Sequence, residues 1–245
     1  MCYGDDARPP LPPVAGAAAD QGPLELTSAD GTRFAAYFAR ASAPSGAGML
    51  ILPDVRGLHE FYKELAQRFA EAGIDAVAID YFGRTAEDQE RGEGFEYRPH
   101  VDKTAPATID ADAAAGIEFL RSAEGGSVRS VFSVGFCFGG GNSWRQSATN
   151  PVDGAIGFYG IPARVREYVT RMKAPLLLLV AGADFTPQEE FQKFDHELSE
   201  AGVAHDLHIY EGAPHSFFDR SFEEHRQACD DAWRRLLDFV KKHTA

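Results

Sequence analysis

Short apolar segments alternate with segments of helical periodicity along most of the chain. Leu176–Ala181 is almost entirely apolar, as expected for a strand that is buried on both faces of a sheet. Apolar residues at helical spacing follow several of these segments, as at Leu58, Phe61 and Leu65. Alternation of this kind predicts an α/β fold, with a mostly parallel sheet, helices on both faces and right-handed crossovers. The expected strands are Met49–Leu52, Ile74–Ile79, Val128–Val134, Asp153–Phe158, Leu176–Ala181 and Ala204–Tyr210.

The pattern favours one domain over residues 22–245. A chain of 245 residues is of the size expected for a single α/β domain. Ahead of the alternating part, Asp30-Gly31 separates two strand-like segments and predicts an antiparallel hairpin. Residues 1–21 are rich in Pro, Ala and Gly and are expected to form an irregular N-terminal arm. Residues 82–104 lack a clear period, and we expect them to cover part of the domain as a lid would.

Composition restricts the partners and the cellular setting. The formal net charge is −13, and no basic patch is evident, so nucleic acid is not an expected partner. A small anionic substrate remains compatible because one or two arginines can bind it. The three cysteines cannot form a disulfide framework, and no secretory signal pattern stands at the N-terminus. The longest apolar stretch, Pro175–Ala183, is too short to span a bilayer, so we expect a cytoplasmic protein without membrane contact.

The most specific motif is Gly135-Phe136-Cys137-Phe138-Gly139, between an expected strand and an expected helix. It matches the nucleophile elbow G-x-S-x-G with cysteine in place of serine. The residues two before and two after such a nucleophile crowd together, and glycine removes the clashing Cβ atoms. The helix N-terminus favours a thiolate. The alternative for Cys137 is a buried cysteine in a Gly-rich turn. Cys229 shares a helical register with Trp233 and Leu236 and is expected in the core.

A thiol nucleophile needs a base and an acid that orients the base. In proteins with this elbow the chain order is nucleophile, acid, histidine. Asp184 follows the expected strand Leu176–Ala181, at a carboxyl end where sites of open α/β sheets gather. His215 lies in the loop between the last strand and the last helix. Order and placement therefore favour Cys137, Asp184 and His215 as a catalytic triad, although each acid or histidine alone could be a helix cap or a solvated loop residue.

These residues resemble a known family. Gly135-Phe136-Cys137-Phe138-Gly139-Gly140, together with Asp184 and His215-Ser216-Phe217, is similar to the dienelactone hydrolases (carboxymethylenebutenolidases) of the α/β-hydrolase fold. The resemblance extends from about Leu24 to the C-terminal helix. It implies an α/β-hydrolase fold and a Cys–His–Asp triad. It also implies hydrolysis of an enol-lactone or related ester through a thioester, with no metal and no organic cofactor.

The resemblance also implies a set of binding residues. The backbone N–H groups of Val55 and Phe138 are expected to hold an oxyanion. Asp54 stands where the family usually has a glutamate that contacts the resting thiol, and a turn residue that binds local amides is an equal alternative. Arg84 matches an arginine that binds the substrate carboxylate, whereas Asp219 occupies the place of a second family arginine. Other expected pocket residues are Tyr159, His59, Tyr62 and Tyr97.

Other functions remain open at this point. A broad esterase for small esters or a promiscuous phosphotriesterase would use the same triad, because residues 82–104 and the region around Tyr159 decide substrate choice. A redox-sensing thiol and a non-catalytic binding module belong to different classes of protein. A redox sensor does not need both His215 and Asp184. The expected partner is a small-molecule ester or lactone, bound by a monomer or a small homo-oligomer.

Overall fold

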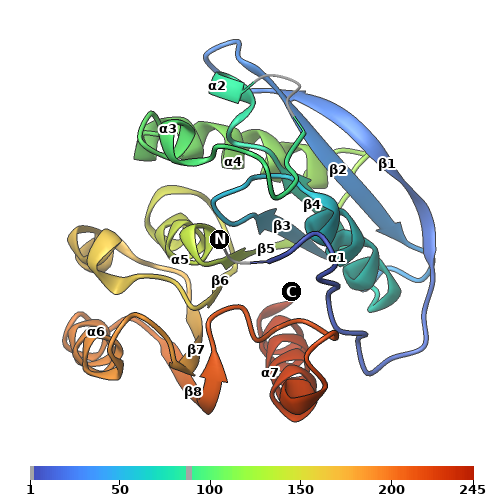
Figure 1. Ribbon diagram of the computed structural model, residues 1–245. Helices are drawn as coiled ribbons and strands as arrows, with labels where there is room; N and C mark the ends of the chain where they lie inside the picture. Colours follow the sequence, from blue (N-terminus) through green and yellow to red (C-terminus); the bar gives the residue numbers. More distant parts are fainter. Residues whose placement is uncertain (1–2, 87–89) are drawn as a thin grey trace.

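A twisted sheet of eight strands runs through the computed structural model, which describes residues 3–86 and 90–245 (Figure 1). The strand order is β1-β2-β4-β3-β5-β6-β7-β8. The pairs β1–β2 and β2–β4 are antiparallel and the other pairs are parallel, which confirms the mostly parallel sheet and the hairpin. The strands are β1 (Ala18–Thr27), β2 (Arg33–Ala41), β3 (Ala47–Leu52), β4 (Asp75–Ile79), β5 (Ser130–Phe136), β6 (Gly154–Phe158), β7 (Leu176–Ala183) and β8 (His205–Pro214).

Helices cover both faces of the sheet because its inner strands are apolar on both sides. In β3, Met49 and Ile51 pack toward α1, whereas Leu50 belongs to the hydrophobic cluster that includes α4. Helices α1 and α7 share one face, and α4, α5 and α6 share the other (Figure 1). The α-helices are α1 (Glu60–Glu71), α2 (Gly83–Ala86), α3 (Arg98–Val101), α4 (Pro106–Arg121), α5 (Phe138–Thr149), α6 (Gln188–Glu200) and α7 (Arg226–His243). The 3₁₀ helices are η1 (Pro162–Arg164), η2 (Arg166–Arg171) and η3 (Glu223–His225).

The N-terminal segment differs from the expected irregular arm. Strand β1 begins at Ala18 and pairs with β2 from Ala41 onward, so residues 18–21 belong to the sheet. The part before β1 lies against the body of the protein, where the Trp233 indole N–H donates to the Pro10 carbonyl at 3.0 Å. We call residues 3–17 the docked arm. Residues 1–2, including Cys2, lie outside the described part of the chain.

The segment 82–104 contains two short helices, α2 and α3. Residues 87–89 of this segment lie outside the described residues. Val101 packs at the edge of the α4 cluster, and the stacked rings of Phe95 and His100 join the segment internally. In the described ranges, no helix combines the length and the apolar character needed to cross a membrane.

Candidate active site

Cys137 is the single residue between the end of β5 and the start of α5. Its backbone lies at φ 55° and ψ −112°, a conformation that side chains rarely adopt. The flanking glycines make this turn possible. A Cβ on Gly135 would lie 1.9 Å from the Gly139 carbonyl oxygen, and a Cβ on Gly139 would lie 2.0 Å from that of Leu52. The predicted elbow is therefore the geometry that the chain adopts.

Asp184 and His215 follow the two strands at the end of the parallel sheet. Ala183 of β7 pairs with Pro214 of β8, so the next residue of each strand arrives at the same edge. Nδ1 of His215 lies 2.9 Å from both carboxylate oxygens of Asp184. The Asp184 side chain is 1% exposed and that of His215 is 15% exposed. The other side of the imidazole hydrogen-bonds to the thiol of Cys137. The structure thus brings the three residues together in the order Cys137, His215, Asp184.

The electrostatics of His215 follow from these contacts. Burial of the ring opposes protonation, but hydrogen bonds and charge interactions with Asp184 and Cys137 outweigh it and raise the pKa of His215 to about 9. The raised pKa favours the protonated ring, which lies beside a sulfur at the N-terminus of α5. Both neighbours favour the thiolate form of Cys137.

Cys137 opens into a cavity of about 460 Å³. Its walls are mostly apolar, and Phe185 forms an exposed lip whose ring centroid lies 4.5 Å from that of His215. Ser216 also lines the cavity, and its hydroxyl is buried with no hydrogen-bond partner among the described residues. The lining residues are Val55, Tyr97, Arg98, Cys137, Phe138, Ile161, Arg164, Phe185, His215 and Ser216.

Three of the residues implied by the resemblance line this cavity. Val55 lies in the loop after β3, and Phe138 is the first residue of α5, whose N–H has no partner within its own helix. Both residues line the cavity into which Cys137 opens. Tyr97, at the start of α3, lies at the mouth of the cavity. All three residues therefore border the space next to Cys137.

Arg84 lies elsewhere and does not line the cavity at Cys137. Its guanidinium is paired with Asp112 at 2.6 and 3.0 Å, with Asp30 at 2.6 Å and with the Thr32 hydroxyl at 2.7 Å. The carboxylate of Asp112 is fully buried. Arg84 therefore joins β1–β2 to α4, and the structure corrects the expectation that it faces the substrate.

Asp54, His59 and Tyr159 also lie outside the lining of this cavity. Asp54 accepts a hydrogen bond from the Arg56 N–H at 2.8 Å, which is the turn role that was the alternative for it. Tyr62 lies nearby, and the Asp54 N–H donates a hydrogen bond to its hydroxyl at 3.0 Å. Tyr159 is fully buried behind His215, with ring centroids 4.8 Å apart. It is therefore placed to support the histidine rather than to touch a ligand.

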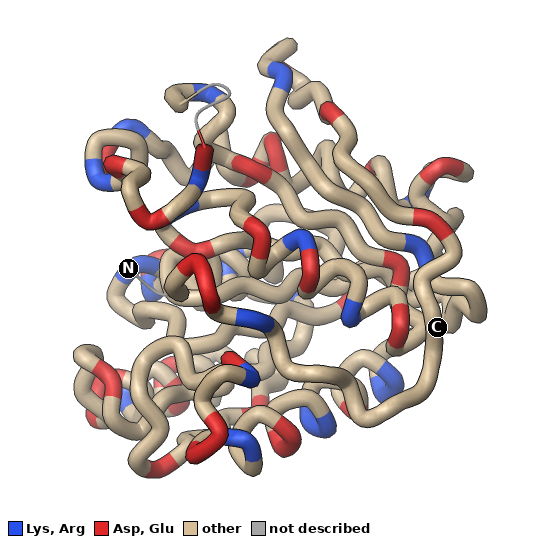
Figure 2. Tube along the Cα trace, turned by 45° about the vertical axis from the view of Figure 1, so that its right-hand side comes forward, with Lys and Arg blue, Asp and Glu red and all other residues tan. Residues whose placement is uncertain are grey.

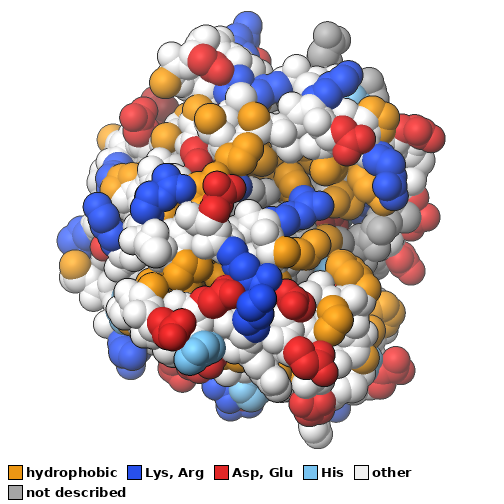
Figure 3. All heavy atoms as spheres, turned by 90° about the vertical axis from the view of Figure 1, so that its left-hand side faces the viewer, with side chains coloured by type: hydrophobic (Ala, Val, Ile, Leu, Met, Phe, Trp, Pro, Cys, Tyr) orange, Lys and Arg blue, Asp and Glu red, His pale blue; other side chains and the backbone are white. Residues whose placement is uncertain are grey.

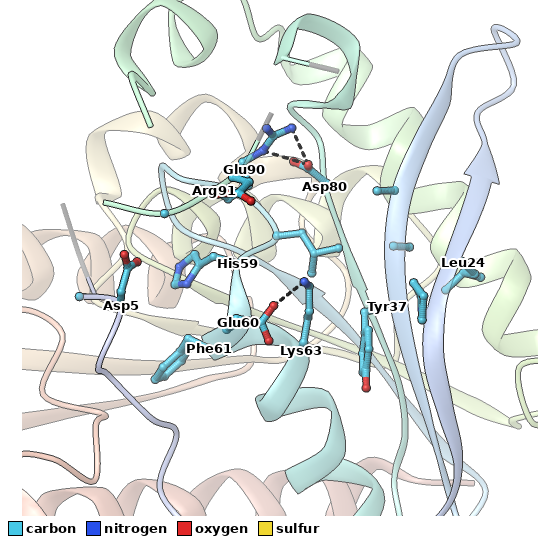
Figure 4. Close-up of a pocket in the computed structure, with 16 residues that line it drawn as sticks. Asp5, Leu24, Tyr37, His59, Glu60, Phe61, Lys63, Asp80, Glu90 and Arg91 are labelled. Atoms are coloured by element: carbon cyan, nitrogen blue, oxygen red, sulfur yellow. Dashed lines mark hydrogen bonds and ion pairs between the residues drawn. The ribbon is translucent and has the colours of Figure 1, made fainter. Parts of the chain in front are cut away.

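His59 faces a second, larger cavity of about 550 Å³ (Figure 4). Two ion pairs lie in its lining: Arg91 binds Asp80 at 2.8 Å and Lys63 binds Glu60 at 2.6 Å. Figure 4 shows Asp5, His59 and Phe61 together at one end of this cavity. The expected pocket role of His59 is therefore not at Cys137, because α1 turns the ring toward the docked arm.

Sequence reasoning missed two arginines at the cavity of Cys137. Arg98 and Arg164 line it, and no described acidic side chain forms an ion pair with either or lines the cavity beside them. The Arg164 guanidinium lies 5.3 Å from the centre of the Phe138 ring. Acidic residues are spread along the whole trace (Figure 2), and basic and hydrophobic side chains adjoin on the face seen in Figure 3. For Arg164 the available signal was its place in the loop after β6, close to Ile161, whereas Arg98 lies in a segment without a clear period and carried no such signal.

Cys229 is buried in α7, as predicted, and its thiol donates to the Phe217 carbonyl at 3.2 Å. Burial raises the pKa of Cys229 to about 12. Within the described ranges, no three His, Cys, Asp or Glu side chains are grouped so that they could hold a metal ion.

A cysteine at a strand-to-helix turn, with an aspartate and a histidine after later strands of one mostly parallel sheet, is the arrangement found in the α/β-hydrolase fold. Within that class, a sequence model of the dienelactone hydrolase family matches residues 34–244, and the chain belongs to this family. It is accordingly a hydrolase that acts on ester or lactone bonds.

Individual relatives are distant but similar over nearly their whole length. A protein named "Putative carboxymethylenebutenolidase" from Saccharolobus solfataricus is 26% identical over 250 residues, covering 87% of this chain and 95% of its own. A protein of the same name from Escherichia coli K12 is 26% identical and covers 87% of this chain and 84% of its own. A solved dienelactone hydrolase-like promiscuous phosphotriesterase from metagenomic libraries has a TM-score of 0.74 at 22% identity, covering 94% and 100% of the two chains. At that identity the structural likeness supports the fold alone.

Proposed function

We propose that this hydrolase uses the thiol of Cys137 as its nucleophile and cleaves an ester or lactone through a thioester intermediate. The observation that carries this proposal is the contact of His215 with Asp184 on one side and Cys137 on the other, at an elbow whose flanking glycines leave no room for a Cβ. A strained backbone such as that of Cys137 is costly and is typical of functional sites, so the strain itself supports a catalytic role for this arrangement.

In the proposed reaction, the Cys137 thiolate attacks the substrate carbonyl and forms a carbon–sulfur bond. The carbonyl oxygen becomes an oxyanion, which the N–H groups of Val55 and Phe138 stabilise. When the tetrahedral intermediate collapses, the bond to the leaving alkoxide or enolate breaks and His215 donates a proton to that oxygen. His215 then takes a proton from water, which attacks the thioester and releases the acid and the free thiol. Asp184 holds the imidazole in place throughout.

The cavity favours a substrate that combines an anionic group with an apolar one. Arg98 and Arg164 present two positive charges that have no acidic partner among the described residues, although the chain as a whole carries a net charge of −13. Phe185, Ile161 and the Phe138 ring supply apolar surface beside them. We therefore assign the role expected of Arg84 to Arg98 and Arg164, as ligands of a carboxylate on the substrate.

The role of Cys137 is tested with an ester that releases p-nitrophenol. We expect the wild type to show acylated Cys137 by mass spectrometry early in the reaction, and Cys137→Ala to lose turnover while its thermal unfolding stays near that of the wild type. Cys229→Ala is the matched control, because this thiol is buried away from the cavity. Turnover by Cys137→Ala close to that of the wild type would refute the proposal. A p-nitrophenyl phosphotriester in the same assay tests the phosphotriesterase alternative.

The anionic substrate is tested by comparing acetate and hemisuccinate esters of p-nitrophenol. For Arg98→Gln and Arg164→Gln we expect the KM of the hemisuccinate ester to rise roughly two- to fivefold each, because exposed charge pairs contribute little individually. The KM of the acetate ester should not change. Arg171→Gln is the control, since Arg171 packs over Tyr168 and does not line the cavity. If the substitutions change the KM of both esters equally, the two arginines do not recognise the negative charge of the substrate.

A further inference from the structure

The docked arm reaches the back of the active site through one residue, Tyr3. The family match begins at residue 34, so this arm lies outside the segment that the family shares. Tyr3 is 2% exposed and its ring stacks on that of Phe61 with centroids 3.8 Å apart. It also meets the ring of Phe136, the residue before the nucleophile, at 6.2 Å. An aromatic residue near the chain terminus thus packs as deeply as the core of the domain.

The hydroxyl of Tyr3 makes a specific polar contact at this depth. It hydrogen-bonds to the hydroxyl of Tyr159, which is itself fully buried. The Tyr159 ring lies against the ring of His215, and its backbone is held at φ 40°. A tyrosine with positive φ persists only where its surroundings hold it. Tyr3 is therefore one of the groups that fix Tyr159 and, through it, one face of the imidazole.

Two anchors hold the arm in register for this contact. The Arg56 guanidinium donates to the Tyr3 carbonyl at 2.8 Å and to the Asp5 carboxylate at 2.7 Å. Further along, the Arg8 N–H donates to the Asp219 carboxylate at 3.0 Å, and the Arg220 N–H donates to the Arg8 carbonyl at 2.9 Å. Figure 4 shows Asp5 of the arm beside His59 and Phe61 at the start of α1. Groups from the loop after β3 and from the loop after β8 therefore bind the same short segment.

We propose that Tyr3 is a positioning residue of the active site, acting on His215 through the paired hydroxyls of Tyr3 and Tyr159. Tyr3 does not line the cavity of Cys137, so it touches no substrate there. The ring of His215 has Asp184 at Nδ1, Cys137 on the other side, Tyr159 on one face and Phe185 near it. Tyr159 is the member of this set whose position depends on the arm. This inference rests on the proposed role of Cys137 and His215.

The test measures the second-order rate of alkylation of Cys137 by iodoacetamide as a function of pH, in a Cys2→Ser background. No ester is needed, so the result does not depend on the natural substrate. Tyr3→Phe keeps the ring stacked on Phe61 and removes only the hydroxyl, so we expect thermal unfolding close to that of the wild type. We expect alkylation about fivefold slower and a displaced pH profile, an effect of the order seen between residues in contact. Tyr37→Phe is the matched control, because its hydroxyl binds Gln67 at 3.0 Å beside the other cavity.

A double-mutant cycle separates positioning from general destabilisation. If the two hydroxyls act as a pair, Tyr159→Phe should slow alkylation as Tyr3→Phe does, and the double variant should be no slower than either single variant. Additive effects, or a Tyr3→Phe profile identical to that of the wild type, would overturn the inference. A wild type no more reactive than His215→Asn would overturn the proposed function as well. If the alkylation rate of Cys137 depends on His215 but does not change in Tyr3→Phe, only this inference is overturned and the proposed function stands.

Discussion

Replacing Asp184 by Asn tests how the charge on His215 is maintained. The contacts of His215 raise its pKa from 6.5 to about 9. At 1.36 kcal/mol per pKa unit, the difference corresponds to about 3 kcal/mol of stabilisation of the protonated ring. Asp184 and Cys137 share this stabilisation. The carboxylate supplies part of it, so Asp184→Asn should remove roughly 1 to 2 kcal/mol, or on the order of a factor of ten in the population of the thiolate–imidazolium pair. Loss of the orienting contact adds to that factor, so we expect kcat/KM to fall roughly ten- to a hundredfold.

The direction of the pH change is the sharper test. Without the carboxylate, burial of the ring still opposes protonation, so the pKa of His215 should fall well below about 9. The high-pH limb of Cys137 alkylation, together with the NMR titration of the His215 ring, should move to lower pH by the same amount. Asp195→Asn is the matched control, because Asp195 forms a similar pair with His205 at 3.0 Å elsewhere in the fold. A high-pH limb that stays near pH 9 in Asp184→Asn would refute the assignment of Asp184.

The two remaining predictions concern the elbow and Arg84. Gly139→Ala should abolish activity and lower the thermal unfolding temperature, because its Cβ would meet the Leu52 and Pro53 carbonyl oxygens at 2.0 and 2.3 Å, whereas Gly94→Ala, with open space around it, should do neither. Arg84→Ala should leave KM unchanged for anionic esters but lower the free energy of unfolding by about 3 kcal/mol in urea titrations, because it strands the buried Asp112 carboxylate. The exposed pair Arg33–Glu25 is the control, and Arg33→Ala should cost less than about 1 kcal/mol.

The parts of the fold that local chemistry determines were predictable from the sequence. Leu176–Ala181 could only be a strand buried on both faces, and the structure extends it by two residues to Ala183. The glycines two residues before and after Cys137 predict a tight turn, because a Cβ at either position would clash with the backbone. The structure shows this strained turn. Asp184 and His215 follow strand ends, and parallel strands bring their carboxyl ends to one edge of the sheet. The order of the strands was not needed for that inference.

Positions that depend on distant partners were not predictable in this way. Arg84 pairs with Asp30, 54 positions earlier in the chain, and with Asp112, 28 positions later. Local sequence patterns do not predict partners at such separations. Arg98 lies in a segment without a clear period, so its place at the cavity follows from how the chain returns after α2. In the same way, His59 is the residue just before α1, and the direction of that helix decides which cavity the ring faces.

The two departures from the family pattern have one structural explanation. Asp219 stands where a family arginine was expected, and its carboxylate binds the N–H of Arg8. Asp54 stands in place of a glutamate, and its carboxylate holds the N–H of Arg56, whose guanidinium in turn binds Tyr3 and Asp5. Both substitutions thus serve the docked arm rather than a ligand. An arginine at position 219 could not accept the Arg8 N–H, so the docked arm and the absence of that arginine are coupled. Under the proposed function, Arg98 and Arg164, which line the cavity of Cys137, take the anion-binding role instead.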